Sequence, residues 1–239
     1  MTAGFALEGI VAGYRGASIL HDVSFALPDR GALVVIGPNG SGKSTLMKVA
    51  IGLVRPSSGR VLLAGEDVTA IDAPGRVRRG LGYVPQEANV FRNMSVHDNL
   101  RIGFEALVPR GRGLRRRIDE VLEIFPEIVP KLGVLAGHLS GGQRQMVAMG
   151  AALMPSPTIL ALDEPSAGLS PRNAELLFAA IRRIAANGVS LFLIEQNTRL
   201  GLGAARTGLV LVAGKVKVIS PVEALVADDS IRRLYLGGR

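Results

Sequence analysis

Four segments of the chain are apolar without alternation: Ala32–Ile36, Thr158–Leu162, Val189–Ile194 and Leu209–Val212. Uninterrupted apolar runs of this length are typical of strands buried on both faces, as in parallel sheets. Helical patterns follow three of them, at Lys43–Leu53, Pro171–Ala186 and Thr198–Ala205. This alternation of strands and helices predicts a layered α/β domain with a parallel core.

The N-terminal part of the chain has a different pattern. Phe5–Val11 and Ile19–Leu27 read as strands linked through Tyr14–Ala17, and Gly59–Leu63 reads as another. A smaller antiparallel sheet should therefore flank the core. Between Asn89 and Pro157 strand signals disappear and helix signals replace them. We therefore expect one domain over 1–239, with 1–88 and 158–239 forming the catalytic core and the antiparallel part, and 89–157 forming an inserted helical subdomain.

Composition narrows the possible chemistry. The 239 residues are 48% apolar and 20% charged, which is ample for a sizeable core. There are no cysteines and only three histidines, His21, His97 and His138, so cysteine zinc sites and dense histidine clusters are excluded. No apolar run reaches the roughly 18 residues that a membrane-spanning helix needs. The expectation is a protein that stays in the cytoplasm.

The chain is strongly basic, with a formal net charge of +8 at pH 7. Arginines form two groups, Arg76, Arg78 and Arg79 in one and Arg110, Arg112, Arg115, Arg116 and Arg117 in the other. Nucleic acid or the anionic cytoplasmic face of a membrane could attract such groups, but charge runs are more often solvated helix faces. The charge alone does not decide the function.

A glycine-rich segment, Gly37–Thr45 (GPNGSGKST), follows the first buried strand and opens a helix. In this pattern, backbone N–H groups, a lysine and a hydroxyl converge on nucleotide phosphates and Mg²⁺. Lys43 should bind the β and γ phosphates and Ser44 should ligate Mg²⁺, while the glycines keep side chains out of the way. The sequence therefore predicts an ATP site at this strand–helix junction.

Two carboxylates, Asp163 and Glu164, end the second apolar run. They should emerge at the carboxyl edge of the sheet, where the glycine-rich segment also lies. Asp163 can then hold Mg²⁺, and Glu164 can act as the base that polarises the attacking water.

A third segment, Leu139–Gln143 (LSGGQ), opens a helical stretch that runs to about Met154. Its serine and glycines leave exposed N–H groups at a helix N-terminus, which makes a second phosphate-binding surface. One chain should not need two such surfaces for one γ phosphate.

Together, in this order and spacing, the three segments resemble those of the ABC ATPases over essentially the whole chain. The resemblance implies an α/β P-loop NTPase fold with a mixed core sheet, an N-terminal antiparallel β subdomain and an inserted helical subdomain. It also implies that two subunits pair head to tail, so that the LSGGQ segment of one closes over ATP and Mg²⁺ held by the other. The expected nucleotide-binding residues are Tyr14, which would stack on adenine, and Gly37, Pro38, Asn39, Gly40, Ser41, Gly42, Lys43, Ser44 and Thr45, joined from the partner by Ser140, Gly141, Gly142 and Gln143.

The resemblance also assigns residues around the γ phosphate. Gln86 matches the glutamine that touches Mg²⁺ and the lytic water, so Mg²⁺ should be held by Ser44, Gln86 and Asp163. Gln196 stands where most members have a histidine, and an amide can donate a hydrogen bond to phosphate but cannot become cationic near neutral pH. The catalytic set is then Lys43, Gln86, Glu164 and Gln196. Ser166–Ser170 resembles the loop that contacts the partner subunit, although many relatives end it with aspartate.

One branch of the family shares further details: Tyr83-Val-Pro, Val90-Phe91, Leu169-Ser-Pro171, Glu195-Gln-Asn and Leu234-Tyr-Leu-Gly237. This branch is the shorter ATPase subunit of branched-chain amino-acid uptake systems. It implies a peripheral protein on the cytoplasmic side of the membrane, with membrane permeases, a homologous ATPase in a homo- or heterodimer, and an extracytoplasmic solute-binding protein as partners. The alternatives are the ATPase of a lipid or polysaccharide exporter, or a soluble ABC ATPase that acts on nucleic acid, although no nucleic-acid partner is expected. Self-pairing, the solute and the effect of Gln196 on turnover stay open.

Overall fold

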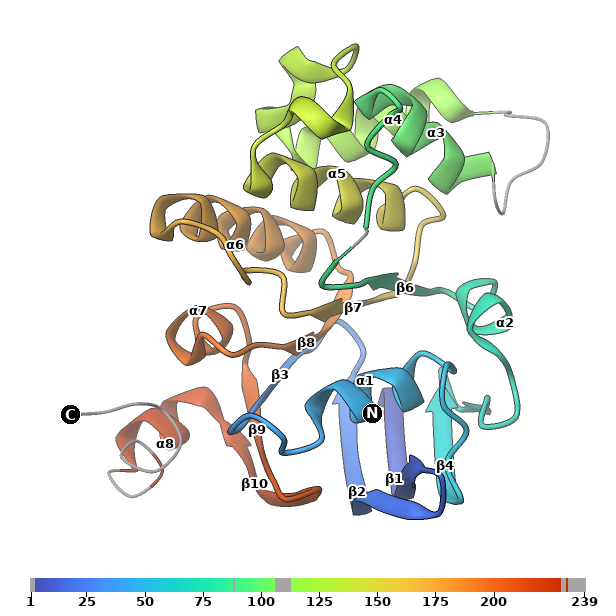
Figure 1. The fold of residues 1–239 in the computed structure, drawn as a ribbon, viewed down its shortest axis with the longest axis vertical. Helices are drawn as coiled ribbons and strands as arrows, with labels where there is room; N and C mark the ends of the chain where they lie inside the picture. The colour runs from blue at the N-terminus through green and yellow to red at the C-terminus, as the bar shows by residue number, and fades with distance from the viewer. Residues whose placement is uncertain (1–2, 88, 106–112, 229–230, 232–239) are drawn as a thin grey trace.

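The computed structural model describes residues 3–87, 89–105, 113–228 and 231. It contains two β-sheets, the smaller of which lies at the lower edge of the view in Figure 1. The larger sheet has the strand order β10-β9-β3-β8-β7-β6. Its strands are β3 (Ala32–Ile36), β6 (Leu81–Val84), β7 (Ile159–Asp163), β8 (Ser190–Ile194), β9 (Thr207–Val212) and β10 (Lys215–Pro221). All pairings are parallel except that of β10 with β9. The predicted mixed core sheet is confirmed.

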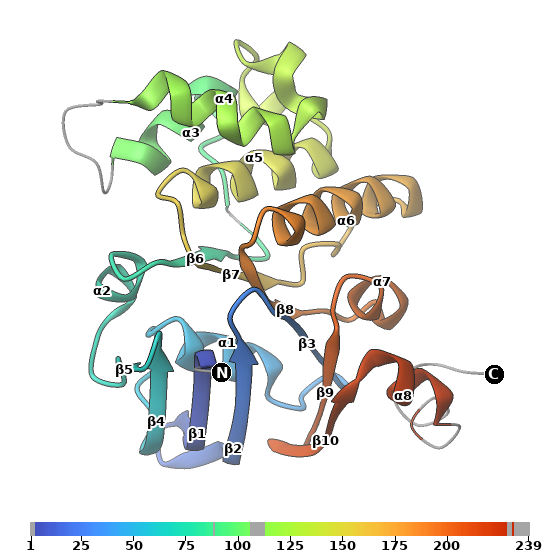
Figure 2. The ribbon, with the colours of Figure 1, turned by 180° about the vertical axis from the view of Figure 1, so that it is seen from behind.

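The smaller sheet is antiparallel, as predicted, with the order β2-β1-β4-β5. Its strands are β1 (Ala3–Tyr14), β2 (Ala17–Pro28), β4 (Ser58–Leu63) and β5 (Glu66–Asp67). Helix α1 (Lys43–Ala50) packs between the two sheets and contacts β1, β2, β7 and β8. Outside the interval between β6 and β7, the other helices are α2 (Ala73–Val77), α6 (Pro171–Ala186), α7 (Thr198–Leu202) and α8 (Val222–Ala227) (Figure 2).

Strand β3 shows why the apolar runs do not alternate. Val34 and Ile36 join a hydrophobic cluster with α5 and α6, whereas Leu33 and Val35 join a second cluster with α1 and the antiparallel sheet. Both faces of the core sheet are therefore covered, and every residue of β3 is buried.

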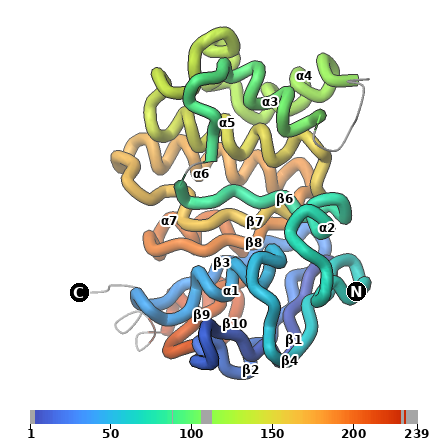
Figure 3. Tube along the Cα trace, turned by 45° about the vertical axis from the view of Figure 1, so that its right-hand side comes forward, coloured from blue at the N-terminus to red at the C-terminus, as the bar shows by residue number. Residues whose placement is uncertain are grey.

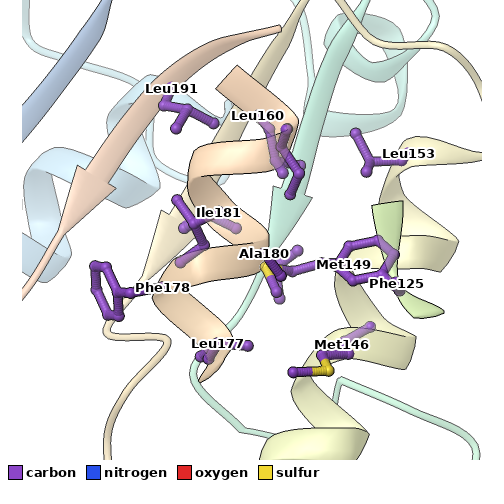
Figure 4. Packing of buried hydrophobic residues seen from close by; sticks show 14 of the residues in the cluster. Phe125, Met146, Met149, Leu153, Leu160, Leu177, Phe178, Ala180, Ile181 and Leu191 are labelled. Atoms are coloured by element: carbon purple, nitrogen blue, oxygen red, sulfur yellow. The ribbon is translucent and has the colours of Figure 1, made fainter. Parts of the chain in front are cut away.

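Helices occupy the chain between β6 and β7 in the described residues of that interval, and they stack above the sheet in Figure 3. They are α3 (Val96–Glu105), α4 (Leu114–Ile124), the 3-10 turns η1 (Pro126–Lys131) and η2 (Ala136–His138), and α5 (Gly141–Leu153). Met146 and Met149 of α5 lie beside Phe125, opposite Ala180 and Ile181 of α6 (Figure 4). This contact fixes the helical layer to the catalytic core.

In the first arginine group, Arg78 and Arg79 are exposed, as on a solvated face, but Arg76 is buried. Arg76 is only 1% exposed, and its guanidinium donates to the carbonyls of Val49 and Ala50 at the end of α1 and to those of Thr69 and Ile71. Burial lowers the pKa of Arg76 to about 10. Arg76 thus joins α2 to α1.

In the second arginine group, Arg115 and Arg116 are exposed, whereas Arg117 is partly buried and donates to the carbonyls of Leu153 and Met154. Arg110 and Arg112 lie outside the described residues, as does the Leu234–Gly237 segment.

Strand β10 is present in the structure but is not predicted by the sequence patterns. Its residues alternate between exposed and half-buried positions, as at an edge of the sheet. This leaves no continuous apolar run to detect.

Candidate functional site

The glycine-rich loop joins β3 to α1, as the sequence predicts. Gly37 and Gly42 have φ of 156° and 103°. A Cβ on Gly37 would lie 2.1 Å from the carbonyl oxygen of Leu211, and one on Gly42 would lie 2.9 Å from Cδ2 of Leu20. Only glycine fits both positions, and the tight packing holds the loop close to the sheet edge.

Lys43 is the first residue of α1 and is buried. Its Nζ donates to the carbonyl oxygens of Gly37, at 2.8 Å, and Pro38, at 3.1 Å. Burial lowers the pKa of Lys43, while the nearby Glu164 and Asp163 oppose that shift. The ammonium group is thus held beneath the loop and close to both carboxylates.

A pocket of about 360 Å³ opens at the N-terminus of α1 and is called the phosphate pocket below. It is lined by Ile19, Asn39, Gly40, Gly42, Lys43, Ser44, Thr45 and Glu164. The N-cap of α1 is Gly42, so no side chain caps the N–H groups of the first turn. The hydroxyl of Ser41 is buried and has no hydrogen-bond partner. Uncapped N–H groups and a cation in one pocket fit a bound phosphate chain.

The two carboxylates lie at the carboxyl end of β7. Burial raises the pKa of Asp163 to about 6, and the negative charge of Glu164 adds to the shift, against Lys48 and Lys43. Glu164 has a positive φ of 44°, and its N–H donates to the carbonyl of Ile194 at 2.9 Å. This conformation places Glu164 in the wall of the phosphate pocket.

The donor set suits a hard divalent cation. Ser44 is exposed at the pocket, and Asp163 supplies a carboxylate close to Lys43. Among the described residues there is no cluster of three or more His, Asp or Glu side chains that could hold a metal by itself. Mg²⁺ retains several waters and binds through one or two protein groups and substrate phosphates, so the residues present fit Mg²⁺ delivered with ATP.

The loop after β8 reaches the glycine-rich loop. The side-chain amide of Gln196 donates from Nε2 to Oδ1 of Asn39 at 3.2 Å. Next to it, Glu195 is 1% exposed and accepts hydrogen bonds from the backbone N–H groups of Ser166 and Asn197. The structure therefore brings Gln196 to the predicted phosphate-binding loop of its own chain, and it adds Glu195, whose role the sequence patterns do not reveal.

Gln86 does not line the phosphate pocket in this structure. It is exposed and lines a groove of about 660 Å³, called the outer groove below. The groove is lined by Gln86, Glu87, Asn89, Val90, Arg92, Gly141, Arg144, Gln145, Ala167, Gly168 and Leu169. The buried amide of Gln145 accepts from Asn89 at 2.7 Å and donates to the carbonyl of Gln86 at 3.4 Å. Gln145 thus ties the Gln86 loop to α5, a link that no sequence pattern marks.

Ser140 caps α5. Its Oγ accepts from the N–H of Gln143, and the Gln143 side chain accepts from the N–H of Ser140, which forms a capping box. Gly141 lies in the outer groove, and no residue of 140–143 lines the phosphate pocket. Within one chain the two predicted phosphate-binding surfaces are separate.

Tyr14 ends β1 and is 41% exposed. Its ring lies 5.9 Å from Nζ of Lys48, one turn along α1 from the glycine-rich loop. Tyr14 does not line the phosphate pocket, so its stacking on adenine stays a prediction.

Comparison with known proteins decides the family. Residues 20–167 match the family model described as ABC transporter. The chain is also 38% identical over 227 residues to a probable branched-chain amino acid transport ATP-binding protein, LivF, of Archaeoglobus fulgidus, with 95% of each chain covered. The chain belongs to the ABC transporter family. It is also 32% identical to the lipopolysaccharide export ATP-binding protein LptB of Haemophilus influenzae, over 96% of this chain and 95% of that protein.

The fold of this ABC ATPase agrees with solved members of the family. It matches the ADP form of MJ1267, an ATP-binding cassette of an ABC transporter, with a TM-score of 0.88, 26% identity and complete coverage of both chains. The protein is therefore an ATP-binding and ATP-hydrolysing subunit of a transporter with the P-loop ABC ATPase fold. None of the helices in its described residues has the length and apolar character of a membrane span.

Proposed function

We propose that this ABC ATPase powers the uptake of branched-chain or related amino acids from the cytoplasmic side of the cell membrane. The observation that carries the proposal is the 38% identity to a branched-chain amino acid transport subunit over nearly the full length of both chains. The Glu195-Gln196-Asn197 segment supports the same branch.

In the proposed mechanism, Lys43 and the N–H groups at the start of α1 hold the phosphates, and Tyr14 stacks on adenine. Glu164 accepts the proton of the attacking water, and the amide of Gln196 donates to the γ phosphate. Ser44, Asp163 and, after movement of its loop, Gln86 would hold Mg²⁺, which when bound neutralises charge on the phosphate oxygens. The pairing of Gln196 with Asn39 supports its place near the phosphate pocket.

A second ATPase subunit completes the site in this proposal. The separation of 140–143 from the phosphate pocket within one chain supports closure across a head-to-tail dimer, either with a second copy or with a homologous subunit. Two bound ATP molecules favour the closed pair because each contacts both subunits only in that state. Hydrolysis then reopens the pair and drives the permeases between their two orientations.

The permeases need a docking surface near the catalytic loops. An apolar groove of about 450 Å³ is lined by residues in or next to α2, β6, α3 and α5, namely Ala73, Pro74, Val77, Arg78, Gly82, Tyr83, Gly103, Ala151, Ala152 and Pro155. Tyr83 stands three residues before Gln86, so a permease segment in this groove would move the Gln86 loop. An extracytoplasmic solute-binding protein would act on this subunit only through the permeases.

Two experiments in the native cell test the assignment. Mild solubilisation of membranes with the tagged chain should recover two multi-spanning permeases and a second ATPase. An Ala152→Arg variant, which puts a charge in the apolar groove, should recover less permease, while Ala224→Arg on exposed α8 should not. Deletion of the gene should abolish uptake of labelled leucine, with rescue by the wild-type chain but not by Lys43→Ala.

Export of lipopolysaccharide is the second candidate, favoured by the 32% identity to LptB over a similar share of the chain. Normal leucine uptake in the deletion strain together with loss of lipopolysaccharide from the cell surface would select it. Recovery with nucleic acid and without permeases would instead indicate a non-transport ATPase.

A further inference from the structure

One buried carboxylate lies beside the proposed catalytic residues and has no part in the mechanism above. Glu195 is 1% exposed, and within the described part of the chain it forms no ion pair. A buried charge without a cation is costly unless hydrogen bonds compensate for it. The burial of the Glu195 carboxylate without a cationic partner therefore needs an explanation.

The hydrogen bonds of Glu195 join two loops. Oε1 accepts from the N–H of Ser166 at 3.0 Å, two residues after Glu164, and Oε2 accepts from the N–H of Asn197 at 3.0 Å, directly after Gln196. The loops follow β7 and β8, which are parallel neighbours in the sheet, with Asp163 opposite Ile194 (Figure 1). One carboxylate thus bridges the segment behind Glu164 and the segment that carries Gln196.

The surroundings leave Glu195 little freedom. Its own N–H donates to the carbonyl of Val35 at 3.3 Å, one residue from the end of β3. A Cβ on Gly201 of α7 would lie 3.0 Å from Cβ of Glu195, so the helix passes directly over the side chain. The backbone and Cβ of Glu195 are thus held between the strand that leads to the phosphate loop and α7.

We propose that Glu195 is a positioning residue that holds the Ser166 loop and the Gln196 loop in one arrangement, so that Glu164 and Gln196 keep their places at the same γ phosphate. The inference rests on the proposed roles of these two residues. It assigns Glu195 to the chemical step and not to ATP binding, because the residues that line the phosphate pocket lie outside both loops except for Glu164.

Two variants of the full-length chain test the role. Glu195→Gln keeps the size of the side chain but replaces one acceptor oxygen with an NH₂ group, which cannot accept from a backbone N–H. Glu195→Ala removes both acceptors. We expect kcat for ATP hydrolysis to fall at least about tenfold in both, with KM and the Kd for ATP within about twofold of wild type, as for an interaction that acts only in the transition state.

The matched control lies on the same strand. Ser190 is also fully buried, begins β8 and accepts from the N–H of Arg30 at 2.8 Å, at the end of the strand remote from the site. Ser190→Ala should lower the Tm and leave kcat unchanged. A kcat loss in Ser190→Ala proportional to its loss of Tm would make the effect of Glu195 merely structural and overturn the proposal.

A double-mutant cycle identifies the residue through which Glu195 acts. Adding Glu195→Gln to Gln196→Ala should cost less in kcat than it costs in the wild type, because the loop to be positioned has already lost its amide. Full additivity, an unchanged kcat in Glu195→Gln, or a rise in KM equal to the fall in kcat would each overturn the proposal. Failure of the proposed site is recognised separately, by Lys43→Ala or Gln196→Ala retaining the wild-type rate.

Discussion

At the scale of single residues, the site is built from groups whose ordinary properties are altered by burial. Lys43 donates to two loop carbonyls, and the pKa of Asp163 is raised by burial and by the charge of Glu164. The sequence motifs predict that Lys43, Ser44 and Glu164 line one pocket, because glycine-rich loops and strand ends have few possible geometries. They do not predict Glu195 or Gln145, because a single buried polar residue has no sequence pattern.

Glu164→Gln tests the proposed base. The amide keeps the size of the side chain but cannot accept a proton, so we expect turnover to fall at least about a hundredfold, within the range of a lost general base. ATP binding should persist. Phosphate release and ATP retention measure the two effects, with Glu223→Gln on α8 as a surface control. Normal turnover in Glu164→Gln would rule out Glu164 as the base.

The raised pKa of Asp163 makes the folding stability of the chain depend on pH. Its pKa is raised to about 6 from an ordinary 3.8, so the fold favours the protonated form. The contribution of protonated Asp163 to the free energy of unfolding is fully present below about pH 4 and is lost as the pH rises through about 6. In metal-free and nucleotide-free buffer, Asp163→Asn, which stays neutral, should therefore raise the Tm at pH 7.5, and the gain should shrink below pH 6. An equal gain at pH 5 and pH 7.5 would contradict this assignment.

At the scale of elements, the buried strands follow from uninterrupted apolar runs, and helix α6 is found over Pro171–Ala186 as predicted. Helix α1 ends at Ala50, three residues before the predicted end, where the chain turns through Gly52 with φ of 83°. Arg76 was not predictable as a buried residue, because its four carbonyl partners come from segments separated along the chain.

The contact between α3 and α5 gives an element-scale prediction. A Cβ on Gly103 of α3 would lie 2.4 Å from the carbonyl oxygen of Ala151, so Gly103→Ala should push the helices apart and cost about 1–3 kcal/mol of unfolding free energy. Gly133→Ala is the matched control, because its Cβ would meet no atom within 4 Å. Denaturant unfolding measures both. Equal stability of the two variants would contradict the close packing of α3 and α5.

At the scale of the whole molecule, the order of segments along the chain predicts the parallel core, the antiparallel sheet and the helical layer, whereas the mixed character of the core sheet is implied only by the family resemblance. It does not predict the outer groove or the position of Gln86 in it, since both depend on how the helical layer sits on the core. The separation of Ser140 from the phosphate pocket is likewise a property of the folded molecule, and it motivates the proposed dimer.

The absence of cysteine from the sequence allows a direct test of pairing. Asn39→Cys and Ser140→Cys each place one thiol at an exposed position. In the Glu164→Gln background, we expect a mixture of the two variants to form an interchain disulfide with ATP and not without it, whereas neither variant alone should form it. A mixture that stays uncrosslinked with ATP would contradict head-to-tail pairing between copies and leave the homologous subunit as the partner.

The decisive measurement is the rate of ATP hydrolysis by the purified full-length chain and by its Lys43→Ala variant. Removing the buried ammonium from the phosphate pocket should lower the rate at least about a hundredfold, the scale of losing one preorganised donor to a transition state. Lys217→Ala, on exposed β10, should keep the wild-type rate. A Lys43→Ala chain that folds and hydrolyses ATP at the wild-type rate would show that ATP is not cleaved in this pocket.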